Sequence, residues 1–249
     1  MDFNEIKSQW LLISDLDDTL IGDETALMIL AQEIMKQRDG IILVYNSSRP
    51  CSSIRKSLEN YPDLLNLNPD YLVGALGTEI EIGLRGEQIK EYSQFISKGW
   101  KREQISLLME QIGLDPHSEE YQTPLKASYD LNDVDDYILV KDKLLEYGYQ
   151  VKVIFSGGKN LDIIPKNSGK GAAIEFLRKF IGVIFNQTVV CGDSANDIDM
   201  FSKSAKGIVV GNADVELKRL KGPNIYHANN NYAAGVLEGL YYWGVISKS

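Results

Sequence analysis

A short apolar run that ends in closely spaced acidic residues places the strongest constraint on the fold of this chain. The run from Trp10 to Ser14 is partly β-branched, and Asp15, Asp17 and Thr19 follow it directly. Such a run predicts a buried strand. Open α/β sheets keep their chemistry at the carboxyl ends of their strands. We therefore expect an α/β protein with functional carboxylates at one edge of a parallel sheet.

Asp15 and Asp17 are close enough in sequence to act on one site. Two neighbouring carboxylates repel each other, so either they share a proton or a cation lies between them. Ligands that are all oxygen favour Mg2+ over zinc or copper. The structural alternative is an acidic turn in which one Asp caps the following helix. Three later stretches of the chain favour the catalytic interpretation.

The second apolar run repeats this arrangement. A predicted amphipathic helix through Leu27 and Ile34 is followed by an apolar run over residues 41–45, which leads to Ser47 and Arg49. Strand, helix and strand in this order predict parallel pairing. The Ser47 hydroxyl can hold a phosphate oxygen at a helix start, or it can serve as an ordinary N-cap.

Two further stretches carry charged residues at predicted helix starts. Lys170 follows Gly169, and its ammonium can contact a phosphate or the Asp15 carboxylate. The surrounding residues do not fit a nucleotide-binding P-loop. Asp193 and Asp197 follow the apolar run over residues 188–191. Because they are four residues apart, both can face one point, as metal ligands or as a ligand and its supporting group.

Composition excludes several classes of protein. The 249 residues carry a net charge of −9 without a basic run, which argues against a nucleic-acid partner. Cys51 and Cys191 match no metal-ligand spacing and predict a reduced, cytoplasmic chain. No signal peptide and no apolar stretch of bilayer length are found, so we expect no membrane association.

The middle of the chain has a different pattern of elements from its two ends. Helical and strand patterns between about residues 82 and 156 form an α+β block between two α/β halves. Such a block indicates an inserted domain. We expect a core of residues 1–81 and 157–249 and an inserted domain of residues 82–156.

The four polar stretches together resemble the motifs of the haloacid dehalogenase (HAD)-like phosphohydrolases. The matching residues are Asp15, Asp17, Ser47, Lys170, Asp193 and Asp197. The resemblance implies a Rossmann-like parallel-sheet core with an inserted α+β cap domain of the C2 type. It implies that Asp15 is the nucleophile and Asp17 the general acid and base, with Ser47 and Lys170 on the phosphate. It also implies Mg2+ held by Asp15, the Asp17 carbonyl, Asp193 and Asp197.

Three other stretches resemble one branch of that superfamily, the sucrose-phosphate phosphatases of cyanobacteria and plants. They are Gly77 to Ile80, Lys126 to Tyr129 and Ser156 to Asp162. The resemblance implies substrate contacts from Ser47, Arg49, Thr78, Glu79, Lys126, Ser128, Lys159 and Asn196. It also implies hydrolysis of sucrose 6-phosphate through an aspartyl-phosphate.

Other activities stay open at this stage. The substrate could be another disaccharide or glycoside phosphate, such as mannosylfructose phosphate or glucosylglycerol phosphate. A sugar phosphomutase or phosphotransferase would keep the same motifs, whereas a non-catalytic sugar-binding subunit would have lost at least one of them. We expect a small sugar phosphate as the binding partner. A sugar-phosphate synthase is a candidate protein partner that the sequence does not identify.

Overall fold

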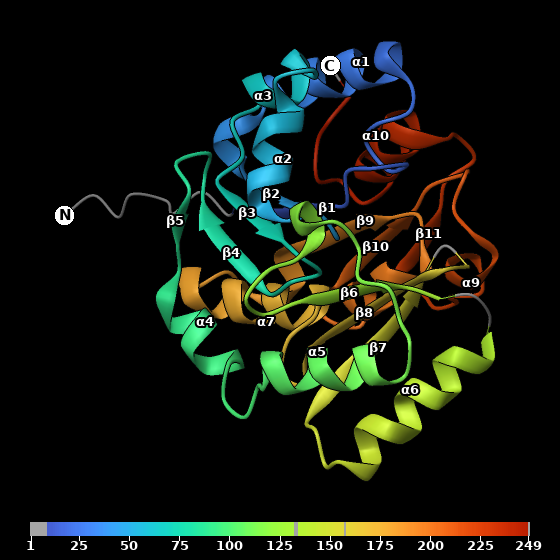
Figure 1. Ribbon diagram of the computed structural model, residues 1–249. Helices are drawn as coiled ribbons and strands as arrows, with labels where there is room; N and C mark the ends of the chain where they lie inside the picture. The colour runs from blue at the N-terminus through green and yellow to red at the C-terminus, as the bar shows by residue number, and fades with distance from the viewer. Residues whose placement is uncertain (1–8, 132–133, 157, 249) are drawn as a thin grey trace.

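A largely parallel sheet forms the core of the protein. The computed structural model describes residues 9–131, 134–156 and 158–248. Within these residues the large sheet has eight strands in the order β11-β10-β9-β1-β2-β3-β4-β5 (Figure 1). The parallel strands are β1 (Trp10–Ser14), β2 (Ile41–Asn46), β3 (Tyr71–Gly74), β9 (Thr188–Gly192), β10 (Lys206–Val209) and β11 (Ile225–His227). Antiparallel β4 (Glu79–Ile82) and β5 (Glu87–Gln88) extend one edge.

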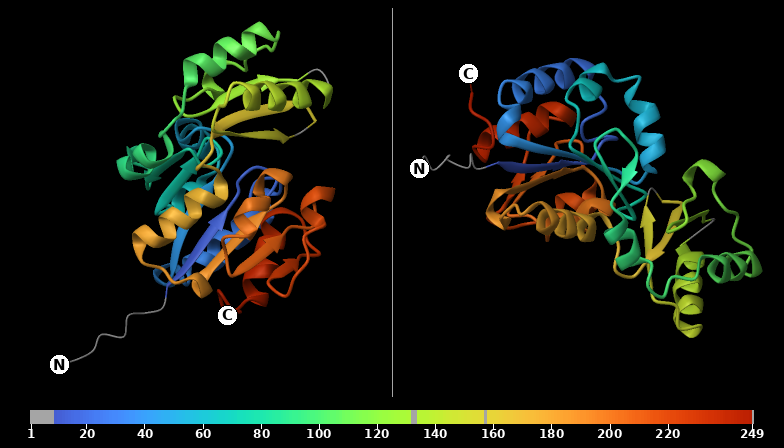
Figure 2. Two further views of the ribbon diagram at one scale, coloured as in Figure 1. Left: turned by 90° about the horizontal axis from the view of Figure 1, so that it is seen from below. Right: turned by 90° about the vertical axis from the view of Figure 1, so that its left-hand side faces the viewer.

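Helices cover both faces of this sheet. On one face α1 (Glu24–Met35) packs against α10 (Tyr232–Tyr242), and on the other α7 (Lys170–Ile181) packs against α8 (Ile198–Phe201) (Figure 2). The shorter helices are α2 (Cys51–Leu58), α3 (Pro62–Asn66), α4 (Lys90–Ile96) and α9 (Val215–Lys218). None of the helices in the described part of the chain is long and apolar enough to cross a membrane. The predicted α/β architecture is confirmed.

A smaller α+β unit lies beside this core (Figure 2). Its antiparallel sheet has the order β6-β8-β7, formed by β6 (Ala127–Asp130), β7 (Val151–Ser156) and β8 (Asn160–Pro165). Helices α5 (Arg102–Gln111) and α6 (Val134–Glu146) belong to the same unit. Ile105, Leu144 and Ile163 are buried in a hydrophobic cluster of its own. We call this unit the cap.

The packing places the ends of the cap elsewhere than the predicted 82–156. Tyr92 and Ile96 of α4 are buried in the main core, because β4 pairs with β3 and carries α4 with it. Leu161 and Ile163 of β8 are buried in the cap, because β8 pairs with β6 on one side and β7 on the other. We therefore propose that the cap runs from about Trp100 to Pro165.

The turn between β3 and β4 joins two parts of the core that carry predicted site residues. Its backbone is left-handed, with φ of 50° at Ala75 and 78° at Gly77. The Ala75 N–H donates to the Arg49 carbonyl at 2.7 Å. A Cβ on Gly77 would lie 2.3 Å from the backbone carbonyl of Gly169, immediately before α7. The turn therefore holds the loop after β2 against the start of α7.

Gly77→Ala tests this close approach, and Gly99→Ala is its matched control. Gly99 has the same φ of 78°, but nothing lies within 4 Å of an added Cβ. The left-handed backbone alone should cost Gly99→Ala about 1 kcal/mol in the free energy of unfolding. Gly77→Ala must also displace backbone, and we expect a loss of about 3 kcal/mol or more in urea unfolding. Equal losses would show that the turn does not pack tightly on Gly169.

Candidate active site

Three adjacent parallel strands carry the predicted catalytic residues to one edge of the large sheet. β1 lies between β2 and β9. Asp15 follows β1, Ser47 follows β2, and Asp193 follows β9. Ser14 pairs with Tyr45, so the strand ends are level. The carboxyl ends of these strands therefore meet at one point, as the sequence predicts.

A tight turn after β1 separates the two acidic side chains. The Leu16 carbonyl accepts the backbone N–H of Thr19 at 3.4 Å, and the next two amides donate to the same oxygen. Asp15 is buried, with 6% of its surface exposed, whereas half of the Asp17 side chain (51%) is exposed. The Thr19 hydroxyl donates to Asp193 Oδ1 at 2.9 Å. This bond joins the turn to the loop after β9.

A buried lysine connects two of the carboxylates. Lys170 is the first residue of α7, and 2% of its surface is exposed. Its Nζ lies 2.6 Å from Asp15 Oδ1 and 2.7 Å from Asp197 Oδ1. Burial alone would lower the pKa of Lys170, but the charges of Asp15 and Asp197 and their hydrogen bonds raise it above its usual value. The ammonium therefore stays charged.

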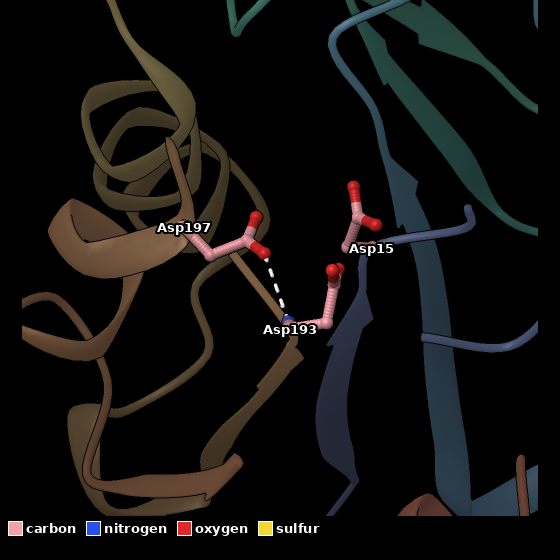
Figure 3. A group of neighbouring side chains, drawn as sticks. All are labelled: Asp15, Asp193 and Asp197. Carbon is pink, nitrogen blue, oxygen red and sulfur yellow. Dashed lines mark hydrogen bonds between the residues drawn. The ribbon is translucent and has the colours of Figure 1, made fainter. Parts of the chain in front are cut away.

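Asp197 uses both carboxylate oxygens within the protein. Oδ1 accepts from Lys170, and Oδ2 accepts the backbone N–H groups of Asp193 at 3.1 Å and Ser194 at 3.2 Å. In Figure 3 the Asp193 side chain points toward Asp15, and the Asp197 carboxylate points toward the Asp193 backbone nitrogen from the side away from Asp15. Asp197 thus shapes the loop that presents Asp193 and at the same time holds Lys170.

The three carboxylates fit a hard divalent cation. Asp15, Asp193 and Asp197 each offer an oxygen within 4.8 Å of the others. Three carboxylates against the single Lys170 ammonium leave two negative charges uncompensated. Burial, more than any neighbouring charge, raises the pKa of Asp15 well above its usual value and that of Asp193 to about 7. A divalent cation bound by these oxygens would offset the unfavourable burial of the ionised carboxylates.

A polar cavity of about 430 Å³ lies beside this cluster, between the core and the cap. It is lined by Ser48, Arg49, His117, Ser118, Tyr121, Lys126, Asp130, Ser156, Lys159, Asn160 and Asp162. Arg49 Nε lies 2.9 Å from Asp17 Oδ2, so Asp17 contacts a residue of the cavity lining. Lys126 of the cap donates to the Ser48 carbonyl of the core at 3.2 Å.

The structure brings several predicted substrate residues to this cavity. Arg49, Lys126 and Lys159 line it. Ser128 is buried beneath it and donates to Asp162 Oδ1 at 2.5 Å. Substrate contact by these four residues stays a prediction.

Thr78, Glu79 and Asn196 lie elsewhere. Thr78 and Glu79 face a separate hollow, where the Thr78 hydroxyl donates to the Ala75 carbonyl and Glu79 accepts the Cys51 N–H at 2.8 Å. The Asn196 side-chain oxygen is buried without a hydrogen-bond partner among the described residues. Substrate contact by these three residues stays a prediction.

Other residues of the cavity were not predicted. Asp162 is buried and forms an ion pair with Lys126 at 3.2 Å, and His117 Nε2 lies 3.2 Å from Asp130 Oδ1. Asp162 ends a stretch that resembles the sucrose-phosphate phosphatases, so a signal for it was present. His117 and Asp130 stand outside any motif, and only the folded cap brings them together.

The chain is similar to known sugar-phosphate phosphatases. The family model described as sucrose-6F-phosphate phosphohydrolase matches residues 8–244. A mannosylfructose-phosphate phosphatase of Agrobacterium fabrum is 34% identical over 94% of this chain and 97% of its own length. Sucrose-phosphatase 1 of Nicotiana tabacum is 30% identical over 96% of this chain, which spans 60% of the tobacco protein.

A solved structure of a sucrose-phosphatase is similar in fold to this chain. The sucrose-phosphatase of Synechocystis, in complex with sucrose and phosphate, has a TM-score of 0.87 and 33% identity. The match covers 95% of this chain and 98% of that chain. The predicted HAD fold is confirmed.

The raised pKa of Asp193 predicts a pH-dependent stability. The folded pKa of about 7 lies above the ordinary value of 3.8, so the metal-free protein loses stability as the pH rises between these values. Asp193→Asn removes this charge. We expect the variant to unfold at a higher urea concentration than the wild type at pH 8, and the advantage to vanish near pH 4.

Added Mg2+ and a control variant complete this test. Mg2+ should stabilise the wild type more than Asp193→Asn, because a ligand that binds only the folded state stabilises it more when it binds more tightly. The exposed Asp39 serves as control, and Asp39→Asn should show neither effect. An Asp193→Asn protein that is no more stable at pH 8, and that responds to Mg2+ like the wild type, would contradict the metal site.

Proposed function

Because this chain belongs to the sucrose-6F-phosphate phosphohydrolase family, we propose that it is a Mg2+-dependent phosphomonoesterase that hydrolyses sucrose 6-phosphate to sucrose and phosphate. The observation that carries the proposal is the buried contact of Lys170 with Asp15 beside a polar cavity between core and cap. The cluster contains a nucleophile, Asp15, the fixed ammonium group of Lys170, and carboxylates that can hold a metal ion. The cavity offers hydrogen-bonding groups for the hydroxyls of a sugar.

Asp15 is positioned to attack phosphorus. Its Oδ1 accepts the Lys170 bond, while Oδ2 has no hydrogen-bond donor among the described residues. Attack by this oxygen breaks the bond between phosphorus and the sugar oxygen and forms an aspartyl-phosphate. Covalent catalysis of this kind divides one difficult displacement into two easier ones. The Ser47 hydroxyl and the Lys170 ammonium bind the phosphoryl oxygens.

Asp17 moves the proton in both steps. It donates a proton to the departing sugar oxygen and then takes one from the water that attacks the aspartyl-phosphate. Its contact with Arg49, which lines the cavity, supports this role.

Mg2+, when bound by Asp15, Asp193 and the Asp17 carbonyl, would supply charge neutralisation for the phosphoryl oxygens. Asp197 orients Lys170 and Asp193, since its two oxygens already accept three hydrogen bonds. A direct metal contact by Asp197 stays a prediction.

The cap supports the choice of a disaccharide phosphate. The cavity of about 430 Å³ lies in the size range of small-molecule sites. Its charged groups, among them Lys126, Lys159 and Asp162, can bond sugar hydroxyls, and a missing hydroxyl would leave them unpaired. Discrimination between sugars is therefore mainly a property of the cap, which supplies most of the cavity lining, while the core contributes Ser48 and Arg49.

A second substrate has a specific observation in its favour. The Agrobacterium relative, at 34% identity, is a mannosylfructose-phosphate phosphatase. Its substrate, like sucrose 6-phosphate, joins a hexose to a fructose phosphate. The two hexoses, glucose and mannose, differ in the configuration of one hydroxyl. Mannosylfructose phosphate is therefore the first alternative substrate.

Asp15→Asn tests the nucleophile. The amide keeps the shape of the side chain but cannot form the acyl-phosphate, so phosphate release should fall by at least about a thousandfold. The far-ultraviolet circular dichroism spectrum should stay that of the wild type. Undiminished phosphate release by a folded Asp15→Asn protein would exclude Asp15 as the nucleophile.

A substrate panel with Mg2+ tests the specificity. We expect the highest kcat/KM for sucrose 6-phosphate, a lower value for mannosylfructose phosphate, and far lower values for glucose 6-phosphate and fructose 6-phosphate. Lys126→Ala should lose this preference more than it loses hydrolysis of p-nitrophenyl phosphate. The exposed Lys166, whose Nζ bonds Gln150, provides the control variant Lys166→Ala. Equal rates across the panel would refute the disaccharide assignment and leave the phosphatase chemistry intact.

A further inference from the structure

A side-chain amide outside the catalytic motifs contacts the catalytic turn. Asn212 lies in the loop after β10, and its Nδ2 donates to the Asp18 carbonyl at 2.7 Å. Its Oδ1 accepts the backbone N–H of Tyr232 at 2.8 Å. Both ends of the amide are therefore used, and the side chain joins the turn after β1 to the start of α10.

The contacted carbonyl belongs to the residue that follows Asp17. Asp18 has a φ of 59°, a left-handed conformation at the point where the turn reverses. Its carbonyl belongs to the peptide between Asp18 and Thr19, so the Asn212 bond fixes the turn one residue beyond Asp17. Arg49 Nε lies 2.9 Å from Asp17 Oδ2 and forms an ion pair with the carboxylate. The orientation of Asp17 depends on this ion pair and on the backbone of the turn.

The other end of the Asn212 amide is attached to a rigid position. Tyr232 has a φ of 50°, and its ring lies against Gly22 at the far end of the same turn. A Cβ on Gly22 would come within 2.3 Å of the Tyr232 ring. The start of α10 thus contacts the turn directly as well as through Asn212.

The loop after β10 also contacts the loop after β9, which carries Asp193. The Asp214 N–H donates to the Asp193 carbonyl at 2.7 Å, and the Asp214 carboxylate accepts the Ala195 N–H at 2.8 Å. Residues 212–214 therefore support the turn that bears Asp17 and the loop that bears Asp193. Among these contacts, that of Asn212 is the one next to the proton-transferring carboxyl.

We propose that Asn212 is a positioning residue that orients Asp17 for proton transfer to the leaving alcohol. This role depends on the proposed phosphatase function, in which Asp17 is the general acid. As the bond from phosphorus to the alcohol oxygen breaks and the bond to Asp15 forms, the proton passes from Asp17 to that oxygen. Without the Asn212 bond the peptide between Asp18 and Thr19 can rotate, and this change in the turn moves the Asp17 carboxyl away from the alcohol.

Substrates with different leaving groups test the proposed role of Asn212. A sugar alcohol is a poor leaving group and needs the proton, whereas p-nitrophenolate departs without one. In Asn212→Ala we expect kcat/KM for sucrose 6-phosphate and for glucose 6-phosphate to fall about tenfold to a hundredfold, as for a misplaced catalytic group. The kcat/KM for p-nitrophenyl phosphate should fall less than about threefold, because kcat/KM reports the step in which the leaving group departs, and p-nitrophenolate needs no proton in that step.

Two other variants complete the experiment. Asn212→Asp keeps the acceptor for Tyr232 but replaces the donor to Asp18 by an oxygen, so it should reproduce the selective loss if Asn212→Ala fails to fold. Asn230→Ala, which removes a side-chain amide bonded to Glu238 nearby, should leave both esters unaffected.

The outcomes separate the role of Asn212 from the proposed function. Equal losses for sugar phosphates and p-nitrophenyl phosphate, or no loss for either, would overturn the positioning role. A wild-type enzyme that hydrolyses neither class of ester would overturn the phosphatase function itself.

Discussion

The contact of the Lys170 ammonium with Asp15 and Asp197 is the interaction on which the rest of the site depends. It joins the end of β1, the start of α7 and the loop after β9 within a nearly solvent-free space. Removing one partner from a buried ion pair typically costs about 3–5 kcal/mol, because the remaining charge is left uncompensated. The same arrangement leaves excess negative charge on Asp15 and Asp193. The site is thus stable enough to fold and still prepared to bind a cation and a phosphate.

The core and the cap contribute different parts of the candidate active site. The parallel strands of the core bring Asp15, Ser47 and Asp193 to one edge, where we propose that the phosphoryl group binds. The cap provides most of the cavity and contacts the core through Lys126, whose ammonium bonds both Ser48 of the core and Asp162 of the cap. A change of sugar specificity can therefore occur in the cap without disturbing the chemistry. This division agrees with the presence of sucrose and mannosylfructose phosphatases among the relatives of this chain.

The sequence predicted the core well because its signals are local. Apolar runs that end in Asp15, Ser47 and Asp193 identify parallel strands, and the carboxyl ends of such strands meet by geometry. The cap boundaries depend on distant pairing, which places β8 between β6 and β7, and for this reason the bounds that we propose differ from the predicted 82–156. For the same reason neither the pair His117 and Asp130 nor the contact from Asn212 to Asp18, which are 194 residues apart, has a sequence signal.

Direct detection of the aspartyl-phosphate tests the central claim most directly. The enzyme would be mixed with Mg2+ and substrate, quenched in acid within one turnover, and digested for peptide mass spectrometry. We expect one phosphoryl group on the peptide that contains Asp15, and its disappearance as inorganic phosphate is released. Steady phosphate release without a phosphorylated peptide, or with the phosphoryl group on another residue, would contradict the account.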